Sequence, residues 1–225
     1  MIFRALAVIV MLATAAEAKR VCFSGPIRQH VIVGASSRIA GSGGAIVASG
    51  IEPLPDWRFR DLNRIVRAHV VRIAPGLAIY HPPPLAGIDV VLEDREHQAQ
   101  LRTERALTVE EPPAPPLVRS IEATDVSGRR TVAAELGQQV PEHALIVIIS
   151  RVERDRLVPL SWALVSGGSL DPMVLWHTPY GCDATVETWV EPKAGERVVL
   201  SWVDDAGRVS EPSKPIVISG ASKGK

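Results

Sequence analysis

The sequence carries no excess of charge of either sign. Lys plus Arg and Asp plus Glu each number 25. Nucleic-acid backbones and anionic membranes attract clusters of Lys and Arg. The densest basic stretch, Arg151–Arg156, is interleaved with acidic residues. We therefore expect no nucleic-acid partner.

Long apolar runs are also scarce, and the one that is present lies at the N-terminus. Arg4 supplies a positive charge, Ala5–Ala15 is almost wholly apolar, and Ala16-Glu17-Ala18 has the small-x-small pattern of a signal-peptidase site. The run is shorter than the roughly 20 residues that cross a bilayer. The pattern predicts a signal peptide over residues 1–18. The protein would then be exported, to the periplasm, the cell surface or the medium, with no membrane span once the signal is removed.

Helical periodicity is nearly absent from the rest of the chain. Asp61–Arg72 has some apolar residues at helical spacing, but it is rich in β-branched residues and leads to Pro75-Gly76, a type II turn pair. Short apolar runs punctuated by Gly, Pro and Asp are typical of all-β proteins. The predicted strands of the first half are His30–Val33, Gly44–Ala48, Trp57–Arg60, Ile65–Ile73, Leu77–Tyr80, Ile88–Leu92 and Leu101–Val109. Those of the second half are Val118–Ala123, Thr131–Ala134, Ala144–Val152, Val158–Leu164, Met173–Trp176, Thr185–Val190, Arg197–Val203 and Pro215–Ile218.

A proline-rich segment divides the chain near its centre. Residues 112–116 contain four prolines, which favour an extended connection without internal hydrogen bonds. We predict a β-sandwich domain over 19–111, a linker over 112–116, a second sandwich over 117–220 and a flexible tail over 221–225. The alternative is that the prolines join two strands of one domain. Each half has about seven strands in about a hundred residues, the size of an immunoglobulin-like sandwich. Leu145–Ile149 is apolar on both strand faces and should be covered on both sides.

One segment of the second half resembles a known family. Val199-Leu-Ser-Trp-Val-Asp-Asp-Ala-Gly-Arg-Val-Ser-Glu-Pro-Ser213 is similar to the last hairpin of bacterial immunoglobulin-like and fibronectin type III-like modules, in which a strand enters a D-x-A-G-N-x-S turn. The matching residues are Asp204, Ala206, Gly207 and Ser210, and Arg208 stands where Asn is more usual. The resemblance implies that the second half is a β-sandwich module used for spacing, display or binding, and it names no ligand. For the first half the assignment rests on strand count alone. Together they predict two tandem immunoglobulin-like β-sandwich domains.

Motifs that carry chemistry are missing. No HExxH pair and no G-x-S-x-G elbow is present. Gly41-Ser-Gly-Gly44 leads into a predicted strand, whereas a phosphate loop precedes a helix. His81 could bind copper or zinc together with His69, but we interpret it as a loop histidine without a partner. We therefore expect no catalytic residues, no cofactor and no tightly bound metal; an enzyme with an unrecognised site is the less favoured alternative.

Five tryptophans are the remaining candidates for a binding surface. Trp162 and Trp202 fit a sandwich core by position and alternation. Trp176 and Trp189 flank the loop that contains Tyr180, and flat aromatic rings often mark carbohydrate or peptide sites. These three residues support a carbohydrate-binding accessory module as an alternative function. Our first hypothesis is a non-catalytic structural or binding module of the bacterial envelope, with an envelope protein or polysaccharide as partner.

Cys22 and Cys182 are the only two cysteines in the chain. Exported proteins meet an oxidising compartment, so we predict that the two form a disulfide. That bond would place the N-terminal segment against the second half, so that the halves pack side by side. Two separate thiols are the alternative.

Overall fold

A computed structural model describes residues 25–26, 30–32, 38–39, 43–49, 57–61, 64–82, 89–93, 100–105, 111–126, 128–165, 172–178, 184–185 and 189–220. Every regular element in these ranges is a β-strand, arranged in several sheets. The expected all-β class is thereby confirmed. No membrane-spanning helix occurs in this described part of the chain.

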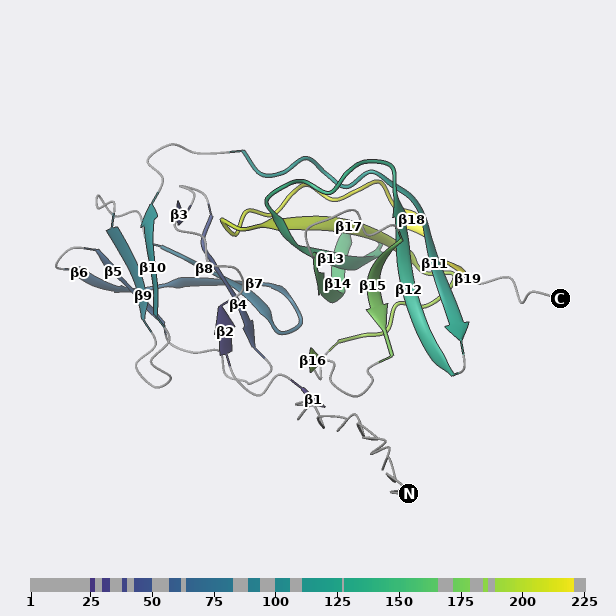
Figure 1. The fold of residues 1–225 in the computed structure, drawn as a ribbon, viewed down its shortest axis with the longest axis horizontal. Helices are drawn as coiled ribbons and strands as arrows, with labels where there is room; N and C mark the ends of the chain where they lie inside the picture. The colour runs from purple at the N-terminus through teal and green to yellow at the C-terminus, as the bar shows by residue number, and fades with distance from the viewer. Residues whose placement is uncertain are drawn as a thin grey trace, which may run out of the picture.

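The first half contains two sheets that lie face to face (Figure 1). One sheet has the order β2-β4-β8-β7, and the other has the order β3-β10-β9-β5-β6. The first is built from β2 (His30–Ile32), β4 (Ala45–Ser49), β8 (Leu77–His81) and β7 (His69–Ala74). The second is built from β3 (Arg38–Ile39), β10 (Gln100–Arg105), β9 (Asp89–Glu93), β5 (Arg58–Asp61) and β6 (Arg64–Arg67). Between the sheets, Val47 and Tyr80 pack against Trp57 and Phe59 in a buried cluster.

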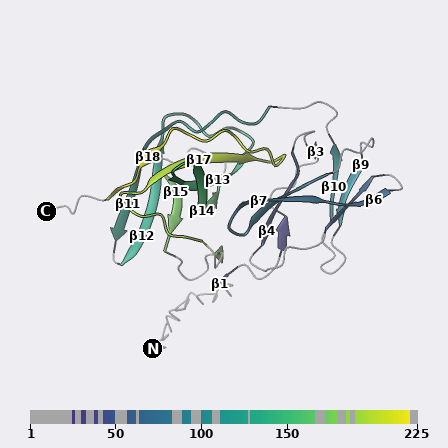
Figure 2. The same ribbon diagram turned by 180° about the vertical axis from the view of Figure 1, so that it is seen from behind.

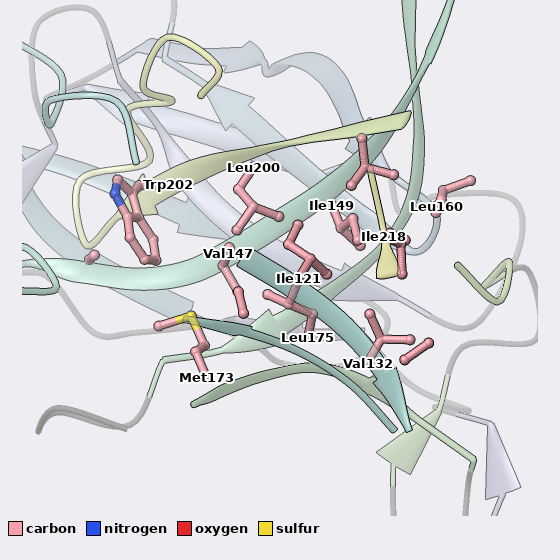
Figure 3. Close-up of a cluster of buried hydrophobic side chains, with 14 residues drawn as sticks. Ile121, Val132, Val147, Ile149, Leu160, Met173, Leu175, Leu200, Trp202 and Ile218 are labelled. Atoms are coloured by element: carbon pink, nitrogen blue, oxygen red, sulfur yellow. The ribbon is translucent and has the colours of Figure 1, made fainter. Parts of the chain in front are cut away.

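The second half also contains two sheets, with a larger core between them. Their orders are β15-β12-β11-β19 and β14-β13-β17-β18. The first sheet comprises β11 (Val118–Val126), β12 (Arg129–Leu136), β15 (Met173–His177) and β19 (Ser219–Gly220). The second comprises β13 (Ala144–Glu153), β14 (Arg156–Leu164), β17 (Arg197–Asp204) and β18 (Ile216–Val217). Figure 3 shows this core, in which Ile121 and Leu175 face Val147, Leu200 and Trp202.

A third cluster of buried side chains joins the two halves, and we name it the inter-half core. Ile46 and Ile79 of β4 and β8 pack against Ile146, Ile148 and Val203 of β13 and β17. In both ribbon views the β7–β8 hairpin lies beside the second half (Figures 1 and 2). The four sheets therefore form a continuous stack with three apolar layers between them.

Strand β13 contributes side chains to two of these apolar layers. Val147 and Ile149 belong to the core of the second half, whereas Ile146 and Ile148 belong to the inter-half core. Successive side chains of a strand point to opposite faces, so both faces of β13 are covered. The prediction that Leu145–Ile149 is covered on both sides is confirmed.

The predicted single strand Ile65–Ile73 is wrong in one respect, because the chain changes sheet within it. Residues 64–67 pair with β5 as β6, and residues 69–74 pair with β8 as β7. Buried Ala68 lies at the change, and its backbone N–H donates to the carbonyl oxygen of Trp57 at 3.3 Å. A run of β-branched residues predicts extended backbone but not the sheet it joins. The predicted turn is present after β7, where Gly76 has φ of 67°.

The proline-rich segment is extended and tied to the second half. Glu111 and Pro115 are exposed, whereas Pro116 is buried. The carbonyl oxygen of Pro115 accepts from Gln138 Nε2 at 3.3 Å. The segment therefore runs along the second half rather than standing clear of it.

Candidate functional site

The turn from Asp204 to Ser210, which carries the family resemblance, is held by one buried carboxylate. Asp204 Oδ1 accepts the backbone N–H groups of Ala206 at 3.1 Å and Arg208 at 2.8 Å. Gly207 has φ of 72°, a conformation that a glycine adopts at no steric cost. Asp204 therefore satisfies the two donors that the turn leaves without a strand partner.

Arg208 completes the same arrangement. Its Nε donates to Asp204 Oδ2 at 2.6 Å, and the two side chains are 13% and 2% exposed. Burial raises the pKa of the Asp204 carboxyl, and the hydrogen bonds and charge of Arg208 oppose that rise. Arg208 Nη1 also donates to the carbonyl oxygen of Glu111 at 2.8 Å, so the turn holds the start of the proline-rich segment. The arginine that departs from the family pattern thus has a structural role.

Two serines, one at the end of the turn and one just beyond it, take the place of a partner strand for β17. Ser210 Oγ accepts from the backbone N–H of Trp202 at 2.9 Å, and Ser213 Oγ accepts from that of Leu200 at 2.9 Å. The backbone N–H groups of the two serines donate back to the carbonyl oxygens of the same residues. Ser210 was part of the sequence pattern, whereas Ser213 was not assigned a role. The sequence signal for Ser213 was its position three residues after Ser210. The two serines make the same contact with Leu200 and Trp202, which are two residues apart on β17.

The Asp204–Ser210 turn also contacts the first half directly. The backbone N–H of Gly44 donates to the carbonyl oxygen of Ala206 at 3.0 Å. A β-carbon on Gly207 would lie 2.0 Å from the carbonyl oxygen of Gly44, and one on Gly44 would lie 2.5 Å from that of Tyr80. Both glycines are therefore required by close backbone approach. Gly44 leads into β4, as the sequence predicted for a strand start rather than a phosphate loop.

A second polar contact between the halves lies within the inter-half core. Trp162 Nε1 donates to the carbonyl oxygen of Pro75 at 3.0 Å, at the β7–β8 turn. Trp162 is 6% exposed, and Trp202, in the core of the second half, is fully buried. The prediction of a sandwich-core position is confirmed for Trp202, whereas Trp162 is buried in the inter-half core instead.

The aromatic residues predicted for ligand binding lie in separate places. Trp189 is half-buried on the inter-half core, and its ring meets that of Trp162 edge-on, with centroids 5.4 Å apart and planes at 85°. Trp176 is half-buried on the other core of the second half. Tyr180 lies outside the described residues. The structure therefore does not bring Trp176 and Trp189 together on one core, and carbohydrate binding stays a prediction.

The histidines His69 and His81, by contrast, are brought together. They are directly opposite each other in the β7–β8 pairing, and their ring centroids are 6.1 Å apart. His81 Nδ1 lies 3.0 Å from the carbonyl oxygen of Gly43. Partial burial lowers the pKa of His81, the hydrogen bond to Gly43 raises it, and the charge of His69 lowers it again. The interpretation of His81 as a loop histidine without a partner is therefore wrong, because it ends a strand.

The predicted disulfide falls on residues outside the described ranges. Cys22 and Cys182 are both there, so their bond stays a prediction. The nearest described residues, Gly25–Pro26 (β1) and Ala184–Thr185 (β16), pair as two short parallel strands, with Gly25 opposite Ala184. The N-terminal segment therefore meets the second half a few residues from each cysteine.

No protein-family model matches the chain, and no curated protein matches it. Among the described residues, no three His, Cys, Asp or Glu side chains gather in a group suited to a metal ion. The joint between the halves is made of the inter-half core and the Asp204–Ser210 turn. Its contacts are apolar packing and hydrogen bonds to backbone groups, which fix the position of one half against the other.

Proposed function

We propose that the protein is an exported, non-catalytic structural or binding module of the bacterial envelope. In this proposal residues 1–18 are a cleaved signal peptide. Residues 19–111 and 117–220 are two immunoglobulin-like β-sandwich domains. They act as one unit that presents its loops to an envelope protein or polysaccharide.

The observation that carries the proposal is the inter-half core. A flexible string of domains would leave the outer faces of β4 and β13 polar, because isolated sandwiches expose one face of each sheet to water. Here Ile46 and Ile79 of the first half meet Ile146 and Ile148 of the second, and all four are buried. Large apolar interfaces restrict the motion between domains. Such a body keeps its end loops at a fixed separation, which suits display or spacing.

The buried charges of the joint have a structural role. Asp204 and Arg208, a buried ion pair, are occupied with backbone groups of the turn and with each other. The non-catalytic part of the proposal rests on the sequence, which carries no HExxH pair and no G-x-S-x-G elbow.

Two measurements test the proposal. Expression in a bacterial host followed by fractionation and mass spectrometry should find the chain in the envelope fraction or medium, beginning at Lys19. Crosslinking of that chain in an envelope extract should then capture a specific component. The matched control is Ile148→Asp, which places a charge in the inter-half core and should abolish capture that depends on the fixed arrangement. An uncleaved chain in the cytoplasmic fraction would contradict export.

A glycan-binding screen separates the two binding hypotheses. Retention on a polysaccharide that is lost on Trp176→Ala would favour the carbohydrate-binding module, and capture of a protein alone would favour the structural module.

A further inference from the structure

Two imidazole rings lie side by side at the open end of the β7–β8 hairpin, away from its turn. His69 is the first residue of β7 and His81 is the last residue of β8, and the register pairs them directly. Residues directly opposite on neighbouring strands present their side chains on the same face. The ring centroids are 6.1 Å apart with the planes at 38°.

The hydrogen bond of His81 decides which of its nitrogens is available. A carbonyl oxygen only accepts, so His81 Nδ1 must carry the proton that it shares with Gly43 at 3.0 Å. In the neutral ring the lone pair is then on Nε2. Metal-binding histidines commonly donate their other ring N–H to a backbone carbonyl, which fixes the ring and its tautomer. His81 has this second contact already in place.

We propose that His69 and His81 together bind one divalent transition-metal ion, with Cu²⁺ preferred and Zn²⁺ bound more weakly. Imidazole suits copper and zinc, and divalent copper forms the stronger complexes with a given set of nitrogen ligands. Metal–nitrogen bonds of about 2.0–2.1 Å allow two rings on one ion to have centroids up to roughly 6.5 Å apart. The separation of 6.1 Å lies within that reach.

The site has two protein ligands, so the ion would keep open positions. No group of three or more candidate ligands exists among the described residues. The other positions would be filled by water, and the ion would exchange rather than be retained through purification.

The two histidines also lie next to the joint between the halves. His81 contacts Gly43, and the next residue, Gly44, donates to Ala206 of the Asp204–Ser210 turn. An ion that ties His69 to His81 would hold this end of the first sheet. Because a ligand that binds only the folded state raises stability, metal binding should raise the melting temperature as well.

The test is a titration of the untagged chain with CuCl2 and, separately, ZnCl2. Copper binding is followed by calorimetry and by electron paramagnetic resonance, and melting is followed by circular dichroism. The expected result is one Cu²⁺ per chain with nitrogen hyperfine structure from two imidazoles, and a higher melting temperature. His69→Ala should weaken binding at least about tenfold, as the loss of an outer-shell partner alone does.

Two further variants make the outcome decisive. His69 is exposed, so its replacement should leave the fold intact. His177→Ala removes another exposed histidine, on β15, and should bind copper like the unmodified chain. His81→Asn keeps a donor near the position of Nδ1 for Gly43 but removes the imidazole, and it should lose binding without loss of fold. Equal copper binding by His69→Ala and the unmodified chain, or no binding by either, would overturn the proposal.

Discussion

The carbonyl oxygen of Gly44 and the α-carbon of Gly207 are in such close contact that no side chain fits between them. A β-carbon on Gly207 would stand 2.0 Å from that oxygen. Gly207 belongs to the Asp204–Ser210 turn of the second half and Gly44 leads into β4 of the first. This one backbone contact therefore couples the turn geometry to the packing of the halves.

Gly207→Ala should be strongly destabilising. A left-handed conformation costs an alanine about 1–2 kcal/mol, and forcing an extra group into a packed site adds about 1–3 kcal/mol. Gly195→Ala is the matched control, because Gly195 has φ of 86° with no atom within 4 Å of the added carbon. In urea denaturation, Gly195→Ala should lower the free energy of unfolding only by the conformational cost. Gly207→Ala should lower it clearly more. Equal losses would show that the contact with Gly44 relaxes freely.

The inter-half core predicts that both halves unfold together. Ile148→Ala removes a side chain that is 4% exposed, and such truncations cost about 2–5 kcal/mol. The control Leu164→Ala removes a side chain that is 63% exposed, and it should change stability by about 0.5 kcal/mol or less. Ile148→Ala should lower the midpoint of a single cooperative unfolding transition, and fluorescence and circular dichroism should give the same midpoint. Two separate transitions in the unmodified chain would mean that the halves fold independently.

Limited proteolysis should cut within residues 110–116 and leave two fragments that stay associated. Glu111, Pro112, Ala114 and Pro115 are exposed, and extended backbone is accessible to a broad-specificity protease. Because the buried cluster spans the cut, the fragments should co-elute from a sizing column under native conditions. Fragments of Ile148→Asp should separate. Early cleavage within residues 65–80 would instead indicate one continuous domain.

Replacing Asp204 and replacing Arg208 should have non-additive effects on stability, because the two side chains form one buried ion pair. Removing one partner of a buried pair leaves an uncompensated charge, at a cost of about 3–5 kcal/mol. Arg208→Met should therefore be costly, and Asp204→Asn should be costly as well. The double variant should be less destabilised than the sum of the two, which urea denaturation in a double-mutant cycle measures. Additive losses would mean that each residue acts only through the backbone groups it contacts.

Thiol titration tests the predicted bond between Cys22 and Cys182. The denatured, unreduced protein from an oxidising compartment should show no free thiol, because β1 and β16 bring the flanking chain segments together. The reduced protein should be less stable by up to about 5 kcal/mol, the entropy of a long closed loop. Two free thiols per chain would contradict the bond.

Much of the fold follows from local sequence signals. The alternation and β-branched content placed most strands, and the apolar run Leu145–Ile149 identified a strand covered on both faces. The break at Ala68 was missed, because β-propensity continues through the point where the chain leaves one sheet for the next. A period of two shows which face is apolar, but it does not show what covers that face. The sequence therefore indicated that β13 is covered on both faces, but not that the first half supplies one of the covers.

The candidate site was predictable only where its residues are neighbours in the chain. Asp204, Ala206, Gly207 and Ser210 form one local pattern, and the pattern located the turn. The contact of that turn with Gly44 joins residues far apart in sequence and depends on sheet packing, which single-sequence patterns do not encode. His69 and His81 are separated by one predicted turn and were named together from the sequence, but the register that places them directly opposite each other was not predicted.

The sharing of β13 between two cores has a consequence for how the chain is made. The first half leaves the ribosome first, and the outward faces of β4 and β8 carry Ile46, Leu77 and Ile79. Those side chains have no cover until residues 146–203 have also been synthesised. A first half that folded early would therefore expose an apolar sheet face, the kind of surface that recruits chaperones and promotes aggregation. A chain of this design benefits from being kept unfolded until its full length is available.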